Sequence, residues 1–322
     1  MGKIESNTPY DDVFRTLYVE CSELILPLLN EIFQTDYDGS EEIVNLGNEH
    51  FDHGQSGAEE KRITDAFIEV IGRERQNYHV ECESSSDGSI IIRMFQYGAQ
   101  LALMDSCFQN NELYVRFPNA AVMYLRSRPG TPDYMKIRIN TPGGDVTYKI
   151  PTLKVQSYSI EDIFEKKLYF LIPFYIFNIE KEFASYEADD KKLDQLKKTY
   201  VDMRERLEQN VEEGKLRAIT FEAIRDLANK VIQNLAKNHK NVREGIGEIM
   251  GGKVLDLEVF RIRDEGRKEG RREGRKEGKE ERDQELIKNM LSLGRTVEQI
   301  VEFTGMPFDE VKSVESSIKQ TV

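Results

Sequence analysis

Three carboxylates in the first third of the chain have the spacing of a metal-binding hairpin. Asp65 begins one predicted strand, and Glu81 and Glu83 lie two residues apart on the next. Residues i and i+2 of a strand point to the same face, about 7 Å apart along the chain. His79 therefore shares a face with the two glutamates, and Cys82 points to the other face. Acidic side chains gathered in an apolar segment repel one another unless a cation lies between them, and carboxylate oxygens suit Mg²⁺ or Mn²⁺.

These acids predict the hydrolysis of phosphodiester bonds. A divalent metal ion would bind a phosphate oxygen, lower the pKa of a water molecule and offset the charge that develops during attack. In this interpretation Asp65 and Glu81 are metal ligands, and the backbone carbonyl of Cys82 is a further ligand. Glu83 would lie beside the attacking water, so the predicted catalytic residues are Asp65, Glu81 and Glu83.

A second interpretation places the glutamates on the solvent face of an exposed strand. Strands of antiparallel sheets commonly have one polar, solvated face. Against this, Phe67, Val80 and the apolar run 90–92 predict a sheet with little exposed surface.

The segment 90–104 is a predicted helix that follows the second acidic strand directly. Arg93, Gln96 and Gln100 recur at helical spacing, together with Tyr97, and fall on one stripe of this helix. We predict that these three polar side chains contact substrate phosphate beside the hairpin.

The histidines add less to the predicted site. His79 is the only one close to the acids, and a lone imidazole is more often a hydrogen-bonded structural residue than a metal ligand. His50 and His53 have a spacing found in metal sites, but their polar loop offers no cysteine partner.

The order of predicted elements indicates an α/β fold in which a mixed central sheet is flanked by helices. A helix pair is predicted over 8–33, followed by a polar loop with one short strand over 36–62. Further strands are predicted over 63–71, 78–83 and 120–126, and over 135–139 or 146–150. The apolar stretch 168–179 contains Pro173 and is predicted to be a buried core segment. We assign residues 1–178 to this first domain.

The remaining chain is predicted to be helical. Residues 179–260 form a predicted hairpin or bundle, in which apolar residues step by three and four over 193–207 and 221–238 is the antiparallel partner. The simplest explanation is packing within the chain, and homo-oligomerisation through these helices is the alternative.

Two smaller segments follow the predicted helical bundle. Residues 261–283 are a Gly-Arg-Lys-Glu repeat, which predicts a marginal helix or a flexible spacer, or else an arm that contacts phosphate. Residues 284–322 predict a small helix-turn-helix segment. Because its last helix is poor in arginine and lysine, a protein-docking cap is an equal interpretation.

Composition narrows the classes of function. The chain has 322 residues, a formal net charge of −13 and three cysteines. Such a negative charge argues against a protein that coats nucleic acid, but it allows local cationic groups. No apolar run reaches the ~20 residues of a membrane span, the first residues lack a signal-peptide core, and three widely spaced cysteines make no disulfide framework. We expect a cytoplasmic protein.

Several of these segments together resemble a known family. The segment 9–17, PYDDVFRTL, is similar to the D-x-x-F-[KR] start of the Rpn family of recombination-promoting nucleases and transposases, a branch of the PD-(D/E)XK nuclease superfamily. Thr64-Asp65 resembles the strand-borne aspartate of that family. The segment 78–84, YHVECES, resembles its E-x-[QK]-S strand, and 93–97, RMFQY, resembles the helix that follows. The repeat and the segment 294–314 are similar to tails found there.

The resemblance implies a restriction-endonuclease-like fold and a Mg²⁺- or Mn²⁺-dependent DNA endonuclease with Asp65 and Glu81 as metal ligands. It also makes Asp12 a possible acid from the first helix. Position 83 departs from the family, because it carries Glu where the family has Gln or Lys. Glu83 is then either a further ligand or general base, or the mark of a weakened site. The leading hypothesis is an endonuclease, and the alternative is a nuclease-fold protein that binds DNA or oligomerises as a scaffold.

Overall fold

The computed structural model describes residues 9–46, 49–53, 59–63, 66–84, 89–104 and 106–251, and beyond them residues 284, 287–288, 290–291, 295–304 and 308–320. The chain divides into two compact units, 1–255 and 256–322. Asp65 and the repeat within 261–283 lie outside the described residues.

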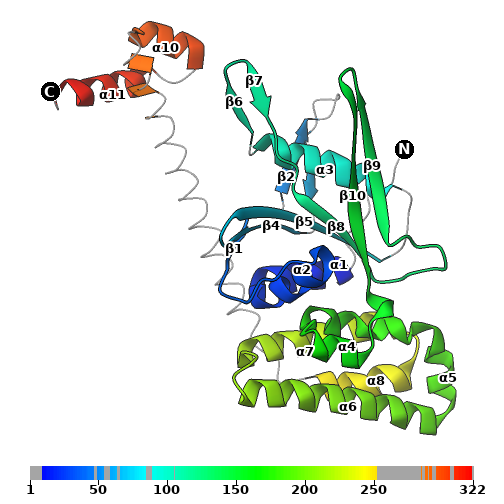
Figure 1. The fold of residues 1–322 in the computed structure, drawn as a ribbon. Coiled ribbons are helices and arrows are strands. Elements are labelled where there is room, and N and C mark those ends of the chain that lie inside the picture. Colours follow the sequence, from blue (N-terminus) through cyan, green and yellow to red (C-terminus); the bar gives the residue numbers. More distant parts are fainter. Residues whose placement is uncertain are drawn as a thin grey trace. The chain divides into compact units, whose positions relative to one another are not determined.

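The first unit is an α/β structure built on a six-stranded mixed sheet, as predicted (Figure 1). The strand order is β1-β4-β5-β8-β10-β9. Its strands are β1 (Glu42–Asn45), β4 (Ala66–Ile71), β5 (Arg75–Glu83), β8 (Asn119–Tyr124), β9 (Tyr134–Thr141) and β10 (Gly144–Lys154). Strands β5, β8 and β10 run parallel, and the other neighbours are antiparallel. Strand β5 is therefore a central strand with a neighbour on each side.

Helices cover both faces of this sheet. Helices α1 (Pro9–Glu20) and α2 (Ile25–Phe33) lie on one face, and α3 (Ile90–Met104) lies on the other (Figure 1). Proline is favoured in the first turn of a helix, where its missing N–H has no partner to lose, and α1 begins at Pro9. The predicted helix pair and the predicted helix 90–104 are confirmed.

One large core joins the sheet to the helical region. The predicted core segment is confirmed as a 3₁₀ helix, η3 (Tyr169–Asn178), most of whose side chains are buried. Helix α7 (Ala218–Leu235) packs against both η3 and α1. Phe14, Phe170 and Ile224 belong to the same apolar cluster and are fully buried. The stretch predicted as domain 1–178 and the described part of the helical region 179–260 thus share one core.

The long helix α6 (Asp190–Glu212) carries the predicted seam. Leu193, Leu196, Tyr200, Met203 and Leu207 are all buried within the chain. Its main partner is α8 (Lys240–Met250), with α5 (Phe183–Ala188) alongside. The predicted partner, α7, touches α6 less extensively because its apolar face is occupied by η3 and α1. A short helix, α4 (Ile160–Glu165), precedes η3.

The segment 36–62 differs from the prediction of a loop with one strand. Besides β1 it contains β2 (Glu49–His53), which pairs with β3 (Glu59–Ile63) in an antiparallel two-stranded ribbon. A second ribbon, β6 (Cys107–Gln109) and β7 (Glu112–Tyr114), was also absent from the prediction. These strands have only three to five residues, so alternation of polar and apolar residues is too short to recognise.

The described part of the second unit is helical, as predicted. Helices α10 (Val297–Thr304) and α11 (Phe308–Gln320) pack around a small core that includes Ile287, Ile300 and Val311. Thr296 caps α10, since its hydroxyl accepts from the Gln299 backbone N–H while the Gln299 side chain accepts from the Thr296 N–H.

None of the helices in the described part of the chain is long and apolar enough to cross a membrane.

Candidate active site

The predicted acidic face of β5 is buried under α3. His79, Glu81 and Glu83 alternate with Tyr78, Val80 and Cys82, which belong to the main core on the opposite face. Glu81 is 5% exposed and Glu83 is 9% exposed. The strand is paired on its far side with β8, where Glu81 lies opposite Val122. The solvent-face interpretation of the two glutamates is therefore wrong.

His79 holds Glu81 in place. Its Nε2 atom lies 2.8 Å from Oε1 of Glu81, and its ring makes an edge contact with Tyr97 on α3. The His79 side chain is fully buried, and its Nδ1 atom has no hydrogen-bond partner in the described structure. The expected hydrogen bond of this histidine is therefore present.

Arg93 of α3 forms an ion pair with Glu83 through its Nη2 atom. The Arg93 side chain is 24% exposed, whereas that of Glu83 is 11% exposed, so the pair lies at the rim of the buried face. The guanidinium that was predicted to contact phosphate thus already has a carboxylate partner. The charge of Glu83 is offset by the protein itself.

The other two predicted phosphate contacts lie differently on α3. Gln96 is exposed, while Gln100 is partly buried and its Oε1 atom lacks a hydrogen-bond partner among the residues described. Tyr97, between them on the same stripe, is buried against His79. The stripe therefore runs along the border between the covered sheet face and solvent.

The backbone at Cys82 suits the predicted ligand role better than its thiol would. The Glu83 carbonyl accepts a hydrogen bond from Leu125 N–H, 2.9 Å away, beyond the end of β8. Successive carbonyls of a strand point to opposite edges, so the Cys82 carbonyl points toward the β4 side. The Cys82 side chain is buried in the main core.

Asp65 itself lies outside the described residues. Ala66, the next residue, opposes Val80, the residue before Glu81. Among the residues that the structure describes, no group of three or more His, Cys, Asp or Glu side chains has the arrangement of a metal site. The oxygen atoms of Glu81 and the Cys82 carbonyl fit Mg²⁺ or Mn²⁺. Glu83, by contrast, is already paired with Arg93. The fit therefore requires Asp65 as a second carboxylate.

Asp12 does not lie with these acids. It is on α1, which covers the opposite face of the sheet, and its Oδ2 atom lies 3.9 Å from Nζ of Lys230. The histidines of β2, His50 and His53, belong to a strand whose side chains are outside the described residues.

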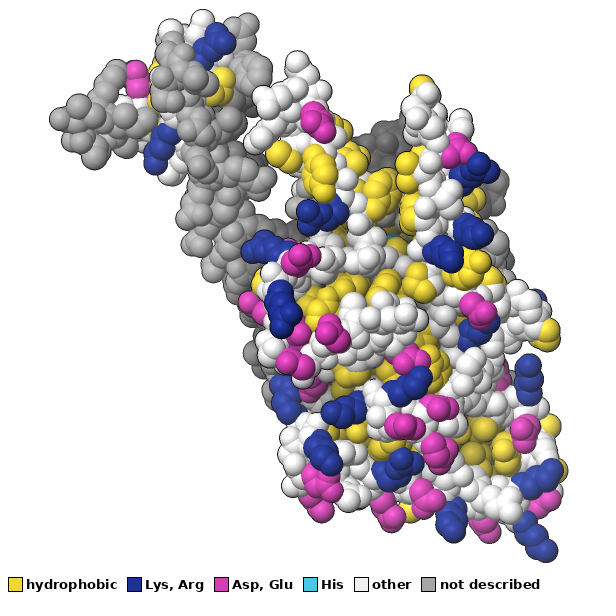
Figure 2. Space-filling view, viewed as in Figure 1, with side chains coloured by type: hydrophobic (Ala, Val, Ile, Leu, Met, Phe, Trp, Pro, Cys, Tyr) yellow, Lys and Arg dark blue, Asp and Glu magenta, His cyan; other side chains and the backbone are white. Residues whose placement is uncertain are grey.

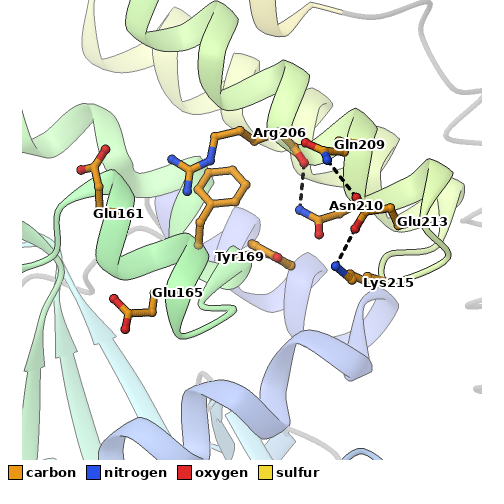
Figure 3. A pocket seen from close by; sticks show the side chains of 9 residues that line it. Glu161, Glu165, Tyr169, Arg206, Gln209, Asn210, Glu213 and Lys215 are labelled. Carbon is orange, nitrogen blue, oxygen red and sulfur yellow. Dashed lines mark hydrogen bonds and ion pairs between the residues drawn. The ribbon is translucent and has the colours of Figure 1, made fainter.

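Two hollows between α4 and α6 are separate from the acidic face. The first has a volume of about 490 Å³ and is lined by Glu161, Arg206 and Lys215, among others (Figure 3). Arg206 lies over the ring of Phe164, 3.8 Å from its centroid. None of the predicted site residues lines either hollow.

Sequence reasoning missed an arginine at the carboxyl end of the central strands. Arg126, two residues after β8, makes two hydrogen bonds to the Glu180 carboxylate of 2.6 and 2.8 Å and one to the Ser84 carbonyl. Its pKa is raised, chiefly by the hydrogen bonds to Glu180. The only available signal in the sequence is an arginine directly after a buried strand.

Comparison of the chain with known protein families, with curated proteins and with solved structures gives no match.

Proposed function

We propose that this protein is a metal-dependent DNA endonuclease of restriction-endonuclease-like fold, acting in recombination or transposition. The observation that carries the proposal is Glu81, a carboxylate that is 5% exposed on the central strand of a mixed sheet. Burial of a carboxylate is costly unless a partner offsets its charge. The proposal therefore gives Glu81 a cation as partner in addition to His79.

The roles follow from the position of each group. Asp65 and Glu81, with the Cys82 carbonyl, would hold Mg²⁺ or Mn²⁺, which supplies an acidified water and charge neutralisation at phosphate. His79 keeps the Glu81 carboxylate in one orientation through its 2.8 Å contact. Gln96, exposed on α3, is a donor to the DNA backbone.

The proposal gives Glu83 a different role from the catalytic one predicted from its sequence position. Its pairing with Arg93 favours the anchoring of that arginine beside the site over direct metal binding. The same pair supports the second candidate function, a nuclease-fold protein that binds DNA or acts as a scaffold with little or no cleavage. In that case Glu83 and Arg93 hold α3 on the sheet and contribute nothing to chemistry.

Nicking of supercoiled plasmid with Mg²⁺ or Mn²⁺ separates the two candidates. The wild-type protein is compared with Asp65→Ala and with Asp36→Ala, which removes an exposed aspartate elsewhere. We expect nicking by the wild type and by Asp36→Ala, and loss of nicking in Asp65→Ala. Equal nicking by all three proteins would overturn the catalytic assignment, and no nicking by any of them would favour the scaffold.

A further inference from the structure

The β9–β10 hairpin is an arm with two unlike faces. On one face Ile137 and Ile150 are buried with Ile90 and Met94 of α3 in a small apolar cluster. Since side chains alternate along a strand, Tyr134, Lys136, Arg138 and Asn140 lie on the other face, which is exposed. Figure 2 shows Lys and Arg side chains gathered along this arm.

Two lysines face each other across the arm. Lys136 opposes Lys149 directly in the antiparallel register. Like charges in this arrangement repel and destabilise the strand pair. The nearby acids do not relieve the repulsion, because Asp145 is hydrogen-bonded to Arg138 at 2.8 Å and Asp133 to Lys154 at 2.7 Å. In the described structure neither lysine has a carboxylate partner.

One aromatic ring lies close to both of these cations. The Nζ atom of Lys149 is 4.4 Å from the ring centroid of Tyr134, and that of Lys136 is 5.5 Å from the same centroid. Tyr134 is 42% exposed. The ring attracts both ammonium groups and keeps them close together at the surface. This concentrates uncompensated positive charge in a chain whose net charge is −13.

The arm belongs to the same sheet as the acidic strand. Residues 152–154 of β10 pair with 122–124 of β8, which pair in turn with 81–83 of β5. Neighbouring strands are about 4.8 Å apart, so the base of the arm lies about 10 Å from Glu81 and Glu83. Register and alternation place Ile150 on the same face of the sheet as Glu81, so Lys136 and Lys149 lie on the opposite face.

We infer that Tyr134, Lys136 and Lys149 form a phosphate-binding face for double-stranded DNA on the β9–β10 arm. The choice of DNA rests on the proposed function, while the preference for a polyanion follows from two facing lysines that have no carboxylate partner among the described residues. One phosphate between the two ammonium groups removes their mutual repulsion. The arm then holds the duplex backbone without reading its sequence.

The test is binding of a labelled DNA duplex to the full chain by fluorescence anisotropy, in EDTA so that no cleavage occurs. The variant Lys136→Ala/Lys149→Ala is compared with Lys198→Ala/Lys237→Ala, which removes two exposed lysines elsewhere, and with the charge-keeping Lys136→Arg/Lys149→Arg. Thermal unfolding of each protein verifies that it is folded. An RNA duplex of equal length is titrated in parallel.

We expect the arm variant to bind DNA about tenfold more weakly and to reduce the slope of log Kd against log salt concentration by about 1 for each lysine. The control and the arginine variant should bind as the wild type does. Equal binding by arm and control variants overturns the inference, as does a loss confined to RNA or an absence of DNA binding in the wild type. Binding that depends on the arm in a protein that never nicks plasmid supports the inference and overturns only the nuclease.

Discussion

Arg93 on α3 pairs with Glu83 on β5, ten residues earlier in the chain, at the rim of a buried acidic face. This pair joins the helix to the central strand. Arg93 also offsets the negative charge of Glu83, which could otherwise have bound metal. Glu81, two residues away on the same face, is held by His79 instead. The two glutamates therefore have different partners, and the structure favours different roles for them.

The strength of the Glu83–Arg93 pair can be measured with a double-mutant cycle. We expect a coupling free energy of about 1–3 kcal/mol between Glu83→Gln and Arg93→Gln, because charge-assisted hydrogen bonds at partly buried sites contribute in that range. The free energy of unfolding of the wild type, both single variants and the double variant in urea gives the value. A coupling indistinguishable from zero would mean that the pair does not hold α3 on the sheet.

Cleavage should respond to Glu83 in a way that depends on its role. If Glu83 only anchors Arg93, then Glu83→Gln leaves the arginine beside the site with its charge uncompensated. We expect plasmid nicking to rise severalfold, since a free guanidinium stabilises the charge on phosphate. Loss of nicking with an unchanged fold would instead identify Glu83 as a metal ligand or general base.

The contact between Glu23 and Arg217 should contribute to the stability of the folded protein against acid. Burial raises the pKa of Glu23, but hydrogen bonds from Arg217 and Thr220 outweigh this effect and lower the pKa below its usual 4.5. The contribution of this carboxylate is therefore complete above about pH 4.5 and is lost as the pH falls through the lowered value.

The variant Glu23→Gln tests this contribution in urea unfolding between pH 7 and pH 3. We expect the wild type to be more stable than the variant at pH 7, and the difference to shrink below pH 4.5. Glu205→Gln, which removes an exposed carboxylate of α6, should differ little from the wild type throughout. A Glu23 difference that stays constant with pH would contradict the assignment.

The three cysteines should react very differently with thiol reagents. Burial raises the pKa of Cys21 to about 12, and Cys82 is 5% exposed, whereas Cys107 is exposed on β6. Since the thiolate is the reactive form, we expect iodoacetamide at pH 8 to modify one cysteine in the native protein and three after unfolding. Peptide mass spectrometry should place the native label on Cys107, and Cys107→Ser should remain unlabelled. Native labelling of Cys21 at a similar rate would contradict the burial of this thiol.

The elements that the sequence predicts well are those with long periodic patterns. Helix α3 has the predicted bounds, 90–104, and the seam 193–207 is buried as expected. The short ribbons β2–β3 and β6–β7 were missed because their pairing depends on the backbone more than on side-chain pattern. The acidic face was predicted from the alternation along one strand, since alternation alone places His79 beside Glu81.

The sequence does not predict which side chains from different elements become partners. The predicted helical stripe put Arg93 near substrate, but only the docking of α3 on β5 reveals Glu83 as its partner. The lysine pair of the β9–β10 arm likewise depends on the register that places Lys136 opposite Lys149. A hairpin whose turn residues are Pro142 and Gly143 could have several registers, and the sequence does not select one.

The most direct measurement is metal-dependent nicking by Glu81→Gln, beside Glu69→Gln as a matched control on the neighbouring strand β4. Both variants remove one strand carboxylate, and the Glu69 side chain is paired with Arg75 rather than with His79. The proposal predicts that Glu81→Gln loses at least about 100-fold in nicking rate, as expected for removal of a metal ligand, while Glu69→Gln keeps the wild-type rate. Wild-type nicking by a folded Glu81→Gln protein would contradict it.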